Sequence, residues 1–211
     1  MKLSVKLLDS ASSIQKNILE ALLPQVQSFM VNAANKMKQV IPPIVIQAIQ
    51  DSPEYNALLG GSLRYELGIP DAENKLAGLI DIWSSNIDVN YKPPSISSRG
   101  IKSSITVGMI KIDFSDVLYS EYAQNIDMFR GYSLPWLEWL LLDGTRILVK
   151  DYEVSFGNYS NSRTGQAIMK SSNQSWNIPS EYTGTINNNW ITRALDNIGP
   201  SVQKAIEGAL L

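Results

Sequence analysis

Four carboxylates have the chemistry for acid–base catalysis: Asp113, Asp116, Glu138 and Asp143. Asp113 with Asp116, or Glu138 with Asp143, could act as the carboxyl pair that hydrolyses a glycosidic bond. Surface and capping carboxylates are far commoner, and nothing in the sequence indicates a raised pKa at any of the four. Histidine and cysteine are absent from the chain. Imidazole bases, thiol nucleophiles, disulfides and Cys/His zinc sites are therefore excluded.

Arginines are the candidate contacts with other molecules. Arg163 could pair with a carboxylate of a neighbouring subunit or with a phosphate, and an intrachain ion pair or a helix C-terminus would use the same guanidinium group. For Arg193, stacking on Trp190 or pairing with Asp196 is the simpler interpretation. Arg64 is a further candidate contact, and it follows Gly60-Gly61 closely.

The stretch 132–149 is the most apolar part of the chain and is expected at the centre of the fold. Pro135 is suited to open a helix over 135–143, Gly144 to end it, and 145–149 to form the next strand. Trp136 and Trp139 could anchor an interface, because tryptophan is enriched at binding hot spots. Their apolar surroundings favour an ordinary role in the core.

The first 85 residues are predicted to be mainly helical. Residues 1–8 alternate like a short strand, and apolar spacings of three and four predict one or two helices over 13–40, kinked or split at Pro24. Pro42-Pro43 should end that section. Ser52-Pro53 should begin a short helix that stops at Gly60-Gly61. These glycines lack the Gly-Lys-Ser/Thr ending of a phosphate loop.

The periodicity changes towards two after Trp83, which predicts strands. One strand over 87–91 should stop at Pro93-Pro94, and 101–114 should be extended with a bend at Gly108. Residues 115–131 show no period and are expected to be a mobile or partner-ordered loop. A further strand is expected at Tyr152–Phe156. The final helix should bend or break at Gly199-Pro200.

These patterns predict a single α+β domain over 1–211, in which helices flank a small, mainly antiparallel sheet. Its expected parts are a strand-and-helix arm (1–40), a helical section (41–85), a β-rich core (86–185) and a C-terminal helix (186–211).

Composition limits the classes of partner. The chain has 211 residues, is 44% hydrophobic and carries a net charge of −2, which argues against gripping nucleic acid through a broad basic face. No window resembles a membrane-spanning helix, and Lys6 and Asp9 interrupt any signal-type segment. Synthesis and assembly in a cytoplasm are expected, without membrane partners.

Five stretches together resemble the neck and tail-completion proteins of tailed bacteriophages, small virion proteins between the portal and the tail. The resemblance covers roughly residues 40–211, and the arginine-bearing pieces are the more specific. The stretches are Leu58–Arg64, Leu134–Leu141, Ser162–Met169, Trp176–Pro179 and Asn189–Leu195.

The resemblance implies a non-enzymatic subunit of a six-fold or twelve-fold homo-oligomeric ring in the virion, assembled in the bacterial cytoplasm. DNA would pass through the ring without sequence-specific binding, no cofactor would be needed, and portal, adaptor or tail-tube proteins would be its partners. A tail terminator capping the tail tube is the nearest alternative. A virion-associated cell-wall hydrolase using the carboxylates, and a helical binding module using the 13–40 face, are alternatives from other classes.

Overall fold

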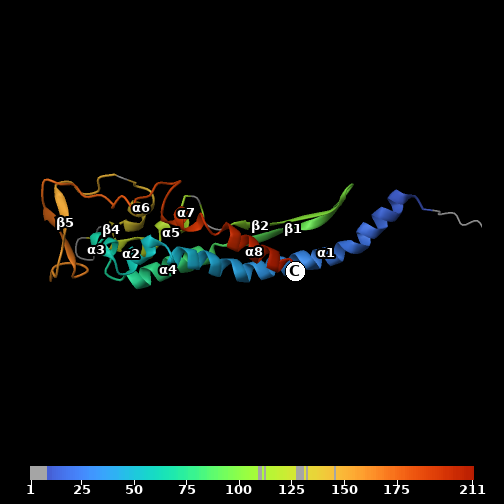
Figure 1. Cartoon of the computed structure of the whole chain (residues 1–211), viewed down its shortest axis with the longest axis horizontal. Helices are drawn as coiled ribbons and strands as arrows, with labels where there is room; N and C mark the ends of the chain where they lie inside the picture. Colours follow the sequence, from blue (N-terminus) through green and yellow to red (C-terminus); the bar gives the residue numbers. More distant parts are fainter. Residues whose placement is uncertain (1–8, 109–110, 112, 127–130, 132, 145) are drawn as a thin grey trace, which may run out of the picture.

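The structure is a computed structural model that describes residues 9–108, 111, 113–126, 131, 133–144 and 146–211. It is elongated, and α1 runs along much of its length (Figure 1). The predicted strand at 1–8 lies outside the described residues. The helices after α1 (Ala11–Gln50) are α2 (Pro53–Leu59), α3 (Ser62–Glu66), α4 (Ala72–Ser85), α5 (Ser115–Leu118), the 3₁₀ turn η1 (Glu121–Ala123), α6 (Trp136–Leu141), α7 (Trp190–Leu195) and α8 (Gly199–Ala209). The strands are β1 (Asp88–Ser97), β2 (Gly100–Gly108), β3 (Asn125–Ile126), β4 (Ser133–Leu134), β5 (Tyr152–Phe156) and β6 (Ala167–Ser171).

The helix α1 is one helix of 40 residues that contains Pro24, Pro42 and Pro43. The predictions that it splits at Pro24 or ends at Pro42-Pro43 are therefore wrong. Figure 1 shows its N-terminal part inclined to the remainder. An interior proline costs about 3 kcal/mol. Full burial of each large apolar side chain contributes about 1.5–3 kcal/mol. The buried residues Met37, Ile41, Val45 and Ile49 thus outweigh the two prolines among them.

The N-terminal part of α1 protrudes from the fold. Among residues 11–32, which we call the α1 extension, none is buried, whereas Ala33 is the first of the buried residues along the helix. Figure 1 shows this part reaching beyond the tip of the β1–β2 hairpin. Helix α1 packs against β1, β2, α7 and α8.

The short helices after α1 follow their local signals. Ser52 caps α2 by accepting a hydrogen bond from the Tyr55 N–H at 3.2 Å, and Pro53 occupies its first turn. The helix ends at Gly60-Gly61, as predicted, and a Cβ on Gly61 would lie 2.8 Å from the Ala57 Cα. This close approach explains why the second glycine is needed.

Strand β1 continues through Pro93-Pro94 to Ser97, so the prediction that these prolines stop it is wrong. Its antiparallel pairing with β2 shifts register between Lys92 and Ser95, which accommodates two residues without an N–H donor. Strand β2 ends at Gly108. The remainder of the predicted extended run to 114 lies partly outside the described residues, and its last residue, Phe114, has a φ of 53°.

Two other expectations need correction. Within 115–126, the expected loop is instead α5, η1 and β3, which bury Val117, Ala123 and Asn125; residues 127–130 lie outside the described part. A strand is expected over 145–149, but residues 146–149 are irregular chain, in which Val149 forms an isolated bridge to Trp176. Thr145 lies outside the described part. A β-branched run forms a strand only where a partner strand is available, and one bridge does not provide it.

The prediction of an α+β fold with small, mainly antiparallel β-structure is confirmed; one sheet is predicted, whereas the described strands form three separate two-stranded antiparallel sheets. The C-terminal helix is broken as predicted, since α7 ends at Leu195 and α8 begins at Gly199, with Pro200 in its first turn. One hydrophobic core extends from Ala34 to Ala209. At its centre the rings of Trp83 and Trp190 meet edge to face, with their centroids 5.5 Å apart.

Candidate functional site

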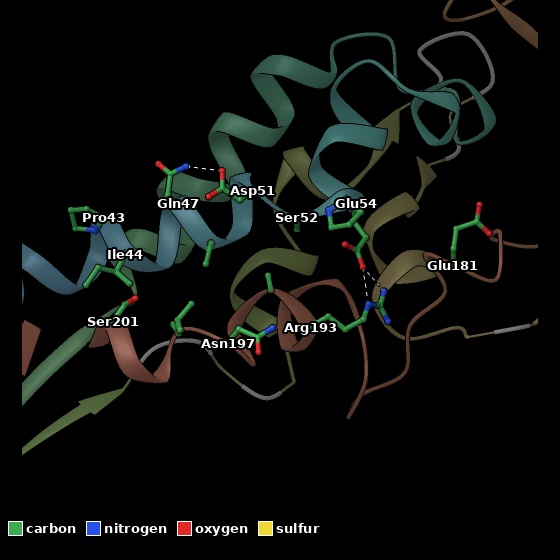
Figure 2. Close-up of a pocket in the computed structure, with 14 residues that line it drawn as sticks. Pro43, Ile44, Gln47, Asp51, Ser52, Glu54, Glu181, Arg193, Asn197 and Ser201 are labelled. Carbon is green, nitrogen blue, oxygen red and sulfur yellow. Dashed lines mark hydrogen bonds and ion pairs between the residues drawn. The ribbon is translucent and has the colours of Figure 1, made fainter. Parts of the chain in front are cut away.

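A hollow of about 800 Å³ lies where the C-terminal end of α1 meets α2, α7 and α8 (Figure 2). Its lining includes the apolar residues Ile44, Ala48, Ala194 and Ile198. Polar side chains line it as well, among them Gln47, whose amide donates to Asp51 at 2.7 Å. A lining that combines apolar side chains with a few polar groups is typical of a binding surface.

An ion pair between Arg193 on α7 and Glu54 on α2 lines this hollow (Figure 2). Arg193 Nε donates a 2.8 Å hydrogen bond to Glu54 Oε1, and Arg193 Nη2 lies 2.7 Å from the same oxygen. The Glu54 side chain is 5% exposed and that of Arg193 30%. Arg193 also donates to the carbonyls of Tyr182 and Thr183. The pair joins segments 139 positions apart in the chain.

This pairing corrects the sequence interpretation of Arg193. Arg193 does form an intrachain ion pair, but its partner is Glu54 and not Asp196. The described contacts of its guanidinium are with carboxylate, carbonyl and amide oxygens. A role of Arg193 as a subunit contact stays a prediction. No local pattern identifies Glu54, because its partner lies on a different helix far along the chain.

A second hollow of about 330 Å³ lies between α3, α6 and the β5–β6 hairpin. Trp139 and Arg163, two predicted contact residues, both line it, together with Glu66 and Trp176. Burial raises the pKa of the Glu66 carboxyl, a hydrogen bond from Trp176 Nε1 at 3.1 Å opposes this rise, and the charge of Glu181 adds to it. No local sequence pattern marks Glu66 or Trp176 as a site residue, because the two lie 110 positions apart in the chain.

Arg163 lies against Gly68, which has a φ of +62°. A Cβ built on Gly68 would stand 3.6 Å from Arg163 Nη1, which is an ordinary contact distance. The positive φ, and not crowding, therefore favours glycine there. Asn125 holds the same turn from the other side by donating to the carbonyls of Leu67 and Gly68.

Arg64 forms hydrogen bonds with backbone carbonyls close to it in the sequence. Its guanidinium donates to three carbonyl oxygens, those of Leu59 at 3.3 Å, Ile69 at 3.2 Å and Pro70 at 2.7 Å. Leu59 is the last residue of α2, so Arg64 satisfies a helix C-terminus and ties it to the loop before α4. Arg64, Arg163 and Arg193 therefore each lie in a different place, and the structure does not bring them into one site.

The two tryptophans of α6 differ. Trp136 is fully buried and donates from Nε1 to the Tyr122 carbonyl at 3.0 Å, which confirms the core interpretation. Trp139 is half-buried at the edge of the second hollow.

The four carboxylates considered for catalysis have separate surroundings. Asp113 accepts from the Ser115 N–H, Asp116 from the Asn86 amide and Asp143 from Arg146, while Glu138 is exposed. Backbone and side-chain hydrogen bonds from Ser115 lower the pKa of Asp113, which is the opposite of what a general acid needs.

Within the described residues, no group of three acidic side chains is placed to hold a metal ion. The described helices also include none with the length and apolar character required to cross a bilayer. Comparisons with protein-family models, curated proteins and solved structures found no match for this chain.

Proposed function

We propose that this chain is a structural subunit that assembles with copies of itself, and that the assembly is a ring in the neck of a tailed bacteriophage. The observation that carries self-assembly is the α1 extension, a helix in which no residue is buried although Ile18, Leu22 and Phe29 are large and apolar. The neck location follows from the resemblance of the five stretches.

The contacts within those stretches support a scaffolding role over a catalytic one. Arg64 binds backbone carbonyls, Trp136 fills the core, and Arg193 pairs with Glu54. Asn189 caps α7 by accepting from two backbone N–H groups at 3.1 Å. Residues used in this way hold a rigid body together.

The test is the molar mass of the full chain in solution, measured by light scattering, first alone and then with portal or tail-tube protein. We expect a closed oligomer, either alone or once a partner is added. A portal-dependent oligomer supports a neck ring, and a tube-dependent one supports the tail terminator. A chain that stays monomeric in both mixtures overturns the proposal.

A further inference from the structure

The α1 extension carries a continuous apolar face. Ile18, Leu22 and Phe29 are 54%, 42% and 45% exposed. Beside them on the helix lies a second row of apolar residues, whose sequence separations alternate between four and three. This is the spacing of residues that pack between two helices. Its members are Leu19, Leu23, Val26 and Met30, and it continues into the buried Ala33 and Met37. The seam is thus buried in the body of the fold, whereas its members in the extension are only half-buried.

The extension gains little helical stability from its own sequence. Its ion pair, Lys16 with Glu20 at 3.6 Å, is exposed and is worth about 0.3–0.5 kcal/mol. Interior Pro24 costs about 3 kcal/mol. Pro24 divides the extension into two shorter segments, and isolated helices below about 12–15 residues are marginal in water. Packing of the apolar face against a partner would supply the helical stability that the extension's own sequence does not provide.

The charge of the extension selects the kind of partner. Between residues 11 and 35 the charged residues are Lys16 and Glu20. Nucleic acid and anionic membranes are bound by clustered lysine and arginine, and this segment has no such cluster. Its net charge is zero, so identical copies do not repel each other. The chemistry therefore fits another apolar helix face.

The width of the face indicates more than one neighbour. At about 100° per residue, the apolar side chains of the face lie within an arc of about 140° of the helix circumference, with Ile18 at one edge and Leu23 at the other. A two-stranded seam is narrower than this. A face of this width can contact two neighbouring helices at once, and a closed ring gives each subunit two such neighbours.

We infer that the α1 extension is the contact between copies of this chain, its apolar face lying between the extensions of two neighbouring copies. This inference rests on the proposed function, because it names the surface through which the proposed ring closes.

The test uses single cysteines in a chain that has none of its own. Cysteine is placed in turn on the face, at Leu19, Leu23, Val26 and Met30, under the conditions in which the wild-type chain oligomerises. The matched control is Ser28→Cys, because Ser28 is exposed and lies on the opposite side of the helix. We expect oxidation to link copies through at least one face position at ten-fold or more the control yield.

Ile18→Asp and Leu22→Asp test the same face by mass. Both residues are exposed in the single chain, so its circular dichroism should be retained while the oligomer dissociates to monomers. Ser28→Asp should leave the mass unchanged. A wild-type oligomer that neither cross-links through the face nor loses mass in the aspartate variants overturns this inference and leaves the ring proposal standing. A wild-type monomer under every condition overturns both.

Discussion

The indole Nε1 of Trp190 donates a 2.7 Å hydrogen bond to the Ser52 hydroxyl, 138 positions earlier in the chain. The same hydroxyl donates to the Ile49 carbonyl at 2.6 Å and accepts from the Tyr55 N–H. One donor and two acceptor positions are all that a serine hydroxyl has. Ser52 therefore joins the end of α1, the start of α2 and the core tryptophan of α7.

Ser52→Ala should destabilise the protein by about 2–4 kcal/mol. It removes a helix cap, worth about 1 kcal/mol, and leaves the buried Trp190 N–H unsatisfied, which costs about 1–3 kcal/mol. Urea unfolding at fixed protein concentration measures the change. Ser10→Ala, which removes the exposed cap of α1, is the control and should cost 1 kcal/mol or less. Equal losses in both variants would contradict the role assigned to Ser52.

Arg193→Met should cost about 3 kcal/mol, because it leaves the buried Glu54 carboxylate without its partner. Adding Glu54→Leu to that variant should recover much of the loss. Arg146→Met breaks the Arg146–Asp143 pair, whose arginine is 70% exposed, and should cost below about 1 kcal/mol. If Arg193→Met behaves like Arg146→Met in thermal unfolding, the ion pair does not hold α7 to α2.

Gly184→Ala should destabilise by about 1–3 kcal/mol. An added Cβ would stand 2.5 Å from the Leu140 carbonyl oxygen and 2.8 Å from that of Leu141, and backbone cannot move aside easily. Gly208→Ala is the matched control, because nothing lies within 4 Å of its Cβ position in α8. It should stabilise the helix by about 0.5–1 kcal/mol. Opposite shifts in the unfolding midpoint are expected, and shifts of the same sign would contradict this packing.

Glu66→Gln should change how stability depends on pH. Burial raises the folded-state pKa of Glu66 above its ordinary value of 4.5. The stability contributed by its protonation is therefore fully present below pH 4.5 and is lost as the pH rises through the raised pKa. The variant has no proton to lose, so its stability relative to the wild-type protein should increase with pH across that window.

Unfolding free energies of the wild-type and Glu66→Gln proteins, measured by urea titration at several pH values from 4 to 7, test this. Glu138→Gln, which neutralises an exposed carboxylate, controls for the loss of one negative charge. Parallel pH profiles for the wild-type and Glu66→Gln proteins would contradict the effect of burial on Glu66.

Features with short-range causes could be predicted from the sequence. Ser52-Pro53 and Gly60-Gly61 bound α2 because caps and helix stops depend on neighbouring residues, and the break at Gly199-Pro200 has the same basis. Trp136 could be placed in the core because its whole neighbourhood is apolar.

Features that depend on distant partners could not be predicted. Pro42-Pro43 lies inside α1 because buried residues on both sides of it favour the helix. Residues 146–149 lack the partner strand that their β-branched pattern needs. The pairing of Arg193 with Glu54, and the hollow that Arg163 shares with Trp139, join segments that no local spacing relates.

The packing of α8 on α1 has a consequence for the order of synthesis. The ribosome makes α1 before α8, so the face of α1 that α8 covers stays uncovered until α8 has been made. A nascent chain with an uncovered apolar helix is prone to aggregate and is the kind of species that chaperones bind. Ribosome stalling or a premature stop codon before α7 would release a chain whose longest helix has lost both of its C-terminal partners.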